Sequence, residues 1–441
     1  MILFLLYIVP IFFFIYYRNA GSLKLGQLNP ISIILYYYWI LVSFIGAIFI
    51  FYGFGNNPVL RISSDRIKTL GVFIVLYVMF AFIIGVSFSR YINGVRNVKK
   101  LFTSFLKEPI NNISINDSYI LFTFDCFLLI LVFSAVYVTY VTGYIPQLKL
   151  TSTADYAAVL LFRVESSRSF NGIVYIKTIL FEQMIPLFCM FYFAFYCKLK
   201  TKKVFRRFLF SLALAIYSLT FSLAKSPLVV FVISLFIEYI YIKGGVKLKT
   251  FFRLIAFAFV LLVLIFFILT KDSLSSVFTY LINRIFIDQI SGMYLMFDMF
   301  PRQHDYLGIS SLSHFLSSSF NITYSEPATR IAMERAFPAA TARGEMNLLS
   351  TLFIGEAWAN FGFLGLIFSP IYIGFLFGMV YYYIISHKKN IFTIVFLANI
   401  SFGLNLTSQF NSYIYNMLFI LKWLIILFLY VVAYIFSFVK K

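Results

Sequence analysis

Charged residues are scarce in this sequence: Asp, Glu, Lys and Arg make up only 12% of its 441 residues, whereas 62% are hydrophobic. The mean hydropathy of +0.92 lies far above that of soluble proteins. A soluble domain of this length has too small an interior to bury so many apolar side chains. The composition therefore excludes a soluble globular protein and predicts a chain that lies in lipid.

Cysteine and histidine are also rare, with three residues of each. All three cysteines lie within apolar runs, so the sequence offers neither a disulfide framework nor a cysteine-based metal site. His304 and His314 do not have the spacing of a helical metal pair, and no third ligand is near them in the sequence. Gly-x-Ser-x-Gly, Walker A and Gly-x-Gly-x-x-Gly motifs are absent. We therefore expect no metal, no cofactor and no nucleotide hydrolysis.

Alternating strands of about ten residues, which are typical of a membrane β-barrel, are absent as well. Long apolar runs are present instead, and each is expected to cross the bilayer as a helix because lipid offers the backbone no hydrogen-bond partner. The sequence predicts eleven spans. They lie near residues 1–17, 31–54, 69–88, 119–141, 173–197, 208–223, 227–242, 251–270, 361–385, 391–406 and 413–438. The pair 208–223 and 227–242 is short and is also compatible with a re-entrant hairpin. The predicted fold is an all-α polytopic membrane bundle in which residues 1–441 form one domain.

Acidic residues are less frequent than basic residues, with 16 Asp and Glu against 36 Lys and Arg. The basic residues concentrate in alternate loops between the predicted spans, at 18–30, 89–118, 198–207, 243–253, 386–390 and the C-terminal tail. Short basic loops face the cytoplasm. The odd number of spans then places the N-terminus outside and the C-terminus inside. The net charge of +20 thus reflects membrane topology rather than nucleic-acid binding.

Two segments of the predicted outer face are long enough to be functional, 142–172 and 271–350. Within the second segment, apolar residues recur at helical spacing over 274–299, which predicts a helix in the membrane interface. Residues 301–342 have the composition of a loop. On the cytoplasmic side, the basic segment 90–107 contains interleaved apolar residues, which predicts an interfacial helix on anionic lipid.

Ionisable groups at the edge of a membrane span are costly unless they line a cavity or meet a partner, so they indicate function. Such groups occur directly before the predicted uninterrupted helix 361–385, where Arg343, Glu345, Glu356 and Asn360 lie among four glycines. A carboxylate here could accept a proton from a substrate hydroxyl, as could His314 in the same outer segment. For Glu356 and Asn360, an equally weighted interpretation is that they cap and anchor the start of the span.

Arginine recurs on the predicted outer face, at Arg163, Arg168, Arg330 and Arg343. A guanidinium group binds phosphate in a bidentate manner, although ion pairs that hold the loops on the bundle would explain the same residues. Lys225 would either add a cation at the edge of the pocket or extend its amine to the interface. Since no nucleotide motif is present, the donor must carry its own leaving group. A polyprenyl-diphosphate-linked sugar is such a donor.

The late element Gly355-Glu-Ala-Trp-Ala-Asn-Phe-Gly-Phe-Leu-Gly365, preceded by Arg343-Gly-Glu and by a long outer segment, resembles the oligosaccharide repeat-unit polymerases of bacteria. This family includes the O-antigen and capsule polymerases. Arg163-x-Glu165-x-x-Arg168 in the first outer segment is also similar to the family. In the order of its spans and loops, most of the chain resembles the family. The matching sequence motifs cover a much shorter part.

The resemblance implies a glycosyltransferase that polymerises undecaprenyl-diphosphate-linked repeat units into O-antigen, as in lipopolysaccharide, or capsule. The reaction would occur on the outer leaflet of the cytoplasmic (inner) membrane, with lipid-linked donor and acceptor and with a chain-length regulator protein as a partner. The outer arginines would hold the diphosphate and sugar. The alternatives are a polysaccharide ligase, a non-enzymatic flippase of the lipid-linked sugar, and a small-solute transporter. The long outer segment disfavours a flippase, and the sequence has no internal repeat that would favour a transporter.

Overall fold

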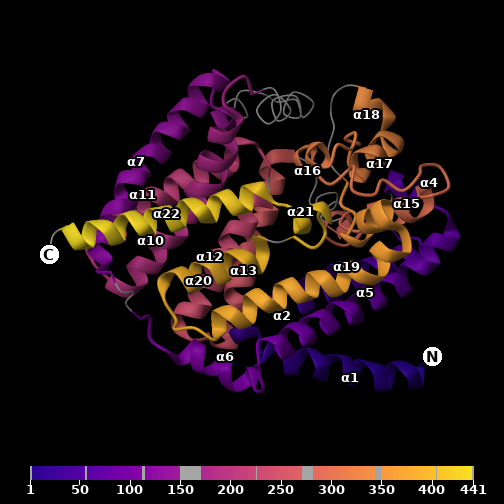
Figure 1. The fold of residues 1–441 in the computed structure, drawn as a ribbon, viewed down its shortest axis with the longest axis horizontal. Coiled ribbons are helices and arrows are strands. Elements are labelled where there is room, and N and C mark those ends of the chain that lie inside the picture. Colours follow the sequence, from indigo (N-terminus) through magenta and orange to yellow (C-terminus); the bar gives the residue numbers. More distant parts are fainter. Residues whose placement is uncertain are drawn as a thin grey trace.

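The structure is a computed structural model that describes residues 2–54, 57–111, 115–148, 170–224, 226–270, 282–342, 349–403 and 405–439. These residues form helices and connections without any strand (Figure 1). Eight of the described helices are long and apolar enough to cross a membrane. The prediction of an all-α polytopic membrane bundle is therefore confirmed.

Each of the eleven predicted runs overlaps a helix, although the helices over 2–20, 248–270 and 391–403 are not among the eight. In chain order the helices are α1 (Ile2–Ala20), α2 (Pro30–Ile33) continued by the π-helix η2 (Ile34–Phe44) and α3 (Ile45–Phe51), α5 (Asp65–Ile92), α7 (Asp117–Thr142), the π-helix η3 (Ile176–Met184) continued by α10 (Ile185–Leu199), α11 (Lys202–Phe221), α12 (Ser226–Lys243), α13 (Leu248–Thr270), α19 (Ile354–Ile385), α20 (Ile391–Gly403), and α21 (Asn411–Ile414) with α22 (Met417–Val439). Both α11 and α12 are long enough to cross the bilayer. This length favours two spans there over a re-entrant hairpin.

Helices α5 and α19 pack side by side and form the largest helix–helix contact of the bundle (Figure 1). Small residues make this close approach possible. A Cβ atom at Gly85 would lie 2.0 Å from the carbonyl oxygen of Ile371, and one at Gly374 would lie 2.0 Å from that of Phe82. Helices in lipid associate through such backbone contacts because burial of apolar side chains provides little driving force between them there. The pair forms a rigid support for the residues at the start of α19.

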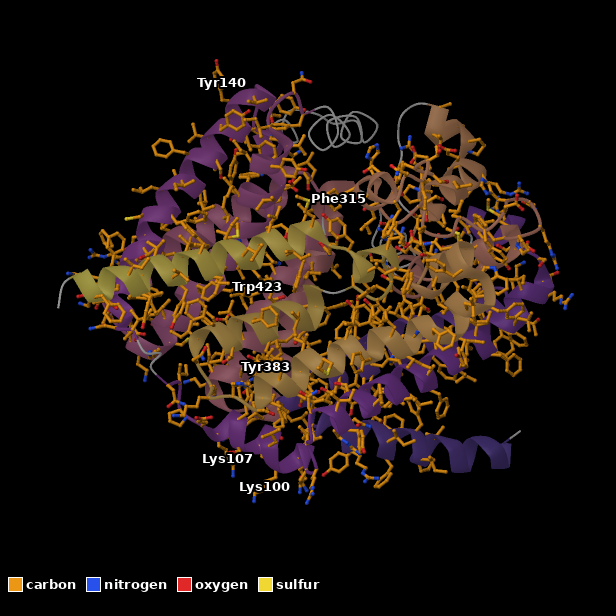
Figure 2. The ribbon with its side chains drawn as sticks, in the orientation of Figure 1. Lys100, Lys107, Tyr140, Phe315, Tyr383 and Trp423 are labelled. Atoms are coloured by element: carbon orange, nitrogen blue, oxygen red, sulfur yellow. The ribbon has the colours of Figure 1, made fainter. Side chains whose placement is uncertain are left out.

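The predicted cytoplasmic loops lie together at one end of the bundle. The amide of Val246 donates to the carbonyl of Gly26 at 2.8 Å, and Lys389 Nζ donates to the carbonyl of Leu106 at 2.9 Å. Helix α6 (Val98–Lys107) belongs to this end and buries its apolar face against the bundle, while Lys100 and Lys107 point outward (Figure 2). The segment is an amphipathic helix, as the sequence predicts, but its apolar face packs on protein. Its contact with anionic lipid stays a prediction.

At the opposite end, the described part of the long outer segment forms the π-helix η4 (Asn283–Ile287), α15 (Ser291–Met299), α16 (His314–Ser319), α17 (Ala328–Ala336) and α18 (Pro338–Ala342). Helix α15 differs from the expected interfacial helix because nearly all of its side chains are buried, against α19, α5 and α4 (Pro58–Ile62). Its apolar residues therefore pack on protein on every side, which periodicity alone does not distinguish from packing on lipid.

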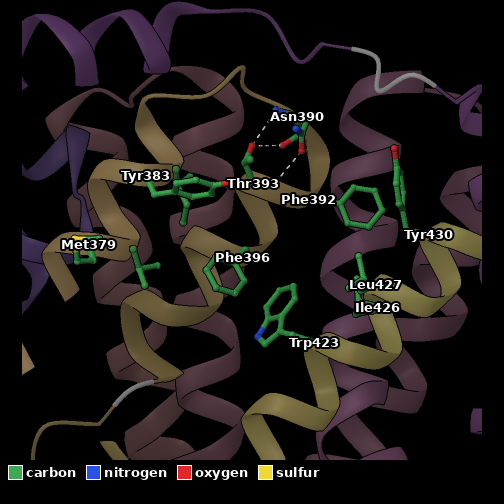
Figure 3. A pocket seen from close by; sticks show the side chains of 12 residues that line it. Met379, Tyr383, Asn390, Phe392, Thr393, Phe396, Trp423, Ile426, Leu427 and Tyr430 are labelled. Atoms are coloured by element: carbon green, nitrogen blue, oxygen red, sulfur yellow. Dashed lines mark hydrogen bonds between the residues drawn. The ribbon is translucent and has the colours of Figure 1, made fainter. Parts of the chain in front are cut away.

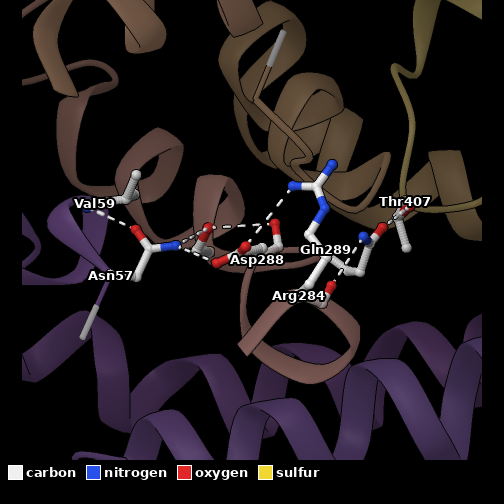
Figure 4. Close-up of polar contacts among 7 residues, drawn as sticks. Asn57, Val59, Arg284, Asp288, Gln289 and Thr407 are labelled. Carbon is white, nitrogen blue, oxygen red and sulfur yellow. Dashed lines mark hydrogen bonds and ion pairs between the residues drawn. The ribbon is translucent and has the colours of Figure 1, made fainter. Parts of the chain in front are cut away.

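Polar contacts join three segments of this outer end (Figure 4). Asn57, which caps α4, donates to Asp288 Oδ1 at 2.7 Å, and Arg284 lies 3.7 Å from Asp288 Oδ2. Thr407, after α20, donates to Gln289 Oε1 at 2.9 Å. Burial raises the pKa of Asp288, although its Asn57 and Arg284 partners oppose this shift. These bonds fix the outer segment on the bundle.

Lys389 gives the end of the bundle that carries the basic loops a predicted pH dependence. Burial lowers the pKa of this amine from 10.5 to about 8, against the attraction of Glu108. Because the folded protein then binds the proton less tightly than the unfolded chain does, stability should rise as the pH increases from about 8 to 10.5. Thermal unfolding of the detergent-purified protein should show this rise relative to Lys389→Met. Parallel pH profiles for the two proteins would contradict it.

Candidate functional site

A sharp bend near the start of α19 shapes the candidate site. Gly362 has φ +57° and ψ −134°, which separates the first two turns from the rest of the helix. The turns fold back so closely that a Cβ atom at Gly365 would lie 1.9 Å from the carbonyl oxygen of Ala357. The bend directs Glu356 and Asn360 into the protein, where they are 0% and 1% exposed.

Asn360 belongs to a closed polar network with Asn411 and Ser311. Its amide nitrogen donates to Asn411 Oδ1 at 2.9 Å, and its oxygen accepts from Ser311 Oγ at 2.8 Å. The amide of Asn411 in turn donates to the carbonyl of Ser311 at 2.7 Å. Asn360 therefore anchors α19 to α21 and to the loop before α16. This is the structural role that the sequence left open for it.

Glu356 joins the same network but is only half satisfied. The backbone amide of Asn411 donates to Oε2 at 2.9 Å. Oε1 is buried and has no hydrogen-bond partner among the described residues. A buried polar atom without a partner costs about 1–3 kcal/mol. Both carboxylate oxygens of Glu238, on α12, are in the same state, so the missing partner at Oε1 supports a functional role for Glu356 only together with its neighbours. A role for Glu356 in anchoring α19 does not explain why its Oε1 is buried without a hydrogen-bond partner in the described part of the chain.

Tyr324 lies in the loop between α16 and α17. Its ring lies 5.5 Å from that of His314, the exposed first residue of α16. Partial burial raises the pKa of its hydroxyl, Glu326 and Glu356 raise it further, and Arg330 lowers it. Among the sequence-predicted residues, Glu356 and Asn360 therefore share the network through Asn411. His314 contacts Tyr324, and Arg330 lies on α17.

Arg330 lies on α17 between two carboxylates. It is 3.1 Å from Glu326 and 3.6 Å from Glu334, with 42% of its side chain exposed. Its charge is thus balanced in the ligand-free protein. An anion that bound Arg330 would have to displace one of these exposed, weak ion pairs.

The other predicted site residues, Arg163, Arg168, Lys225, Arg343 and Glu345, lie outside the described residues. Their proposed roles remain predictions from the sequence. Among the residues that the structure describes, no group of three or more His, Cys, Asp and Glu side chains could hold a metal ion.

An apolar groove of about 460 Å³ lies beside the network. Phe361 and Phe410 line it, directly next in the chain to Asn360 and Asn411. The backbone of Phe410 also lies against the carboxylate of Glu356. Gly365 and Ser369 are small residues of α19 that line the groove, and Ile414 of α21 lines it as well. The arrangement places an apolar groove next to a buried carboxylate.

A second cavity, of about 660 Å³, lies between α19, α20 and α22 (Figure 3). Tyr383, Phe396 and Trp423 line it, and Asn390 closes the end near the cytoplasmic loops. It contacts none of the candidate site residues. We therefore do not include it in the site.

Three residues of the site were missed in the sequence: Ser311, Tyr324 and Asn411. A signal for Asn411 was present, because 405–412 reads Asn-Leu-Thr-Ser-Gln-Phe-Asn-Ser, a polar run between two apolar spans. Another residue of this run, Gln409, donates to Thr329 Oγ1 of α17 at 2.8 Å. Ser311 and Tyr324 lie in a polar loop, where no local pattern distinguishes them from their neighbours.

Fold and site together define a multi-pass α-helical membrane protein with a buried carboxylate at one end of its central helix pair. No protein-family model matches the chain, and neither a curated protein nor a solved structure matches it.

Proposed function

We propose that this protein is a bacterial glycosyltransferase that joins undecaprenyl-diphosphate-linked oligosaccharide repeat units into a surface polysaccharide, O-antigen or capsule. The observation that carries the proposal is the half-satisfied carboxylate of Glu356 beside an apolar groove. A lipid-linked sugar needs both features, because its polyprenyl chain is apolar and its acceptor hydroxyl has to lose a proton. The resemblance of 355–365 to the repeat-unit polymerases points to the same reaction.

In the proposed reaction, the bond between the anomeric carbon of the donor saccharide and its diphosphate breaks. Undecaprenyl diphosphate leaves with the bonding electrons, and the acceptor hydroxyl oxygen bonds to the anomeric carbon. Glu356 accepts the hydroxyl proton, with His314 and Glu345 as the other candidate bases. Cations stabilise the negative charge that develops on the diphosphate. Arg163, Arg168, Arg330 and Arg343 are the candidates, with Lys225 at the edge, and Asn360 positions the helix that carries Glu356.

The orientation in this proposal follows the positive-inside rule. The basic loops around α6 face the cytoplasm, and the network around Glu356 faces the outer leaflet of the cytoplasmic membrane. The N-terminus is outside and the C-terminus is inside. A donor that carries its own leaving group is then required, because the outer leaflet has no supply of nucleotide sugars.

Deletion of the gene tests the proposal when lipid-linked intermediates and surface polysaccharide are separated by size. We expect surface chains reduced to a single repeat unit, which supports a polymerase. Long chains that stay on the carrier lipid would overturn it in favour of a ligase. Repeat units trapped on the cytoplasmic leaflet would overturn it in favour of a flippase. An unchanged profile would reject any role in glycan assembly.

A further inference from the structure

Helix α13 contacts α12 and the short helix η1 (Leu25–Gln27), and its first half borders a long apolar groove. The groove has a volume of about 1030 Å³. Ile33 and Leu41 form one wall, Ile233 of α12 forms the floor, and Phe252 and Phe259 of α13 form the other wall. Among the α13 side chains that the structure describes, Leu248, Ala256 and Val260 are exposed without lining the groove, so this part of the helix contacts the bilayer. The groove is therefore open to lipid rather than to water.

Cations surround one end of this groove. The bond from the amide of Val246 to the carbonyl of Gly26 places Lys24 and Lys247 on adjoining loops. Lys249 and Arg253 follow on the first turns of α13, and Arg253 itself lines the groove. All four side chains are exposed. None of the four makes an ion pair with a carboxylate in the part of the chain that the structure describes.

This cationic end lies far from the network around Glu356. A Cβ atom at Gly244 would lie 2.8 Å from the carbonyl oxygen of Leu106, and Lys389, after the far end of α19, bonds to that same carbonyl. The groove mouth thus belongs to the end of the molecule opposite the start of α19. A ligand anchored there has its charged group away from the candidate site, so it is not the substrate in the geometry proposed above.

We propose that this groove is a binding site for an anionic phospholipid of the leaflet that faces the basic loops. The acyl chains lie between α12, α13 and η2, and the headgroup phosphate lies against Lys247, Lys249 and Arg253. Apolar lining selects a hydrocarbon chain, and four unpaired cations select a negative headgroup. A partner helix would satisfy the apolar walls but would leave these cations without counter-charges. The inference does not depend on the proposed polymerase activity.

The test uses the full-length protein in nanodiscs, with phosphatidylglycerol and phosphatidylcholine as probes and bound lipid counted by native mass spectrometry. The wild type should retain phosphatidylglycerol in preference to phosphatidylcholine. A Lys247→Gln/Lys249→Gln/Arg253→Gln variant should bind phosphatidylglycerol about a hundred-fold more weakly, since each cation contributes about a five-fold factor. Val229→Phe, which fills the groove without changing charge, should reduce retention of both lipids.

Lys202→Gln/Lys203→Gln/Arg206→Gln provides the matched control, because it removes the same number of exposed cations from another predicted cytoplasmic loop and these residues do not line the groove. This variant should keep the retained phosphatidylglycerol. Equal losses in the control and in the groove variant would overturn the proposal, because they would indicate general attraction to basic loops. Equal retention of the two lipids by the wild type would overturn it as well.

Discussion

Replacing Glu356 by Gln should stop chain growth while the protein stays folded in the membrane. Gln has the same shape and keeps an oxygen that can accept the Asn411 amide, now 2.9 Å from Oε2. It cannot accept the proton of a substrate hydroxyl. Loss of a general base typically slows a reaction by about 10²–10⁴-fold. The surface polysaccharide should therefore shrink to single repeat units, as in the deletion strain.

The matched control for this variant is Glu238→Gln. Glu238 is a second fully buried glutamate, on α12, and neither of its carboxylate oxygens has a hydrogen-bond partner among the described residues. It lies outside the network of Asn360, Asn411 and Ser311. We expect Glu238→Gln to give polysaccharide of normal length. Membrane levels of both variants should be compared by immunoblotting.

Two outcomes would refute the assigned role of Glu356. Normal chain length in Glu356→Gln would show that no proton is transferred to this carboxylate. Equal loss of chain length in both variants would show that buried carboxylates support the fold rather than the reaction. In either case Glu345 and His314 would remain as the candidate bases.

The spans were predictable because the bilayer imposes one strong rule. A backbone that crosses lipid has to satisfy its own hydrogen bonds, so an apolar run of sufficient length becomes a helix whatever its neighbours are. The end of α19 at Ile385 was predicted correctly for this reason. Its beginning was not, because the helix starts at Ile354 and bends at Gly362, whereas the sequence indicated an uninterrupted helix over 361–385.

The site was predictable only in part. Glu356 and Asn360 were identifiable because polar groups beside an apolar run are conspicuous. Their partner Asn411 is 51 residues from Asn360 in the chain, and Tyr324 comes from yet another segment. Such pairings depend on how the outer segment folds over the bundle, which hydrophobic periodicity does not encode. The buried position of α15 was missed for the same reason.

Gly362→Ala should destabilise the protein and disrupt the site together. A residue with φ +57° and ψ −134° occupies a region that favours glycine, and holding another residue there costs about 1–3 kcal/mol. A Cβ atom at this position would also lie 2.9 Å from Cζ of Tyr306. Thermal unfolding in detergent should therefore begin at a lower temperature. Chain growth should fall as well, because the bend directs Glu356 inward.

Gly403→Ala is the control for adding a methyl group to a glycine of a membrane helix. Its Cβ atom would meet Asn399 Oδ1 at 3.6 Å, which is an ordinary contact, and the glycine lies at the end of α20. We expect little change in stability. An equal loss in both variants would mean that the bend at Gly362 contributes nothing specific.

A double variant separates the two sources of strain at Gly362. Tyr306→Ala removes the ring that a Cβ atom would meet, but it leaves the positive φ unchanged. If backbone strain dominates, Gly362→Ala should remain destabilising when it is added to Tyr306→Ala. If the ring contact dominates, the second substitution should cost almost nothing. Because Glu356 and Asn360 reach the network only through this bend, the first result would make the backbone of Gly362 a positioning element of the site.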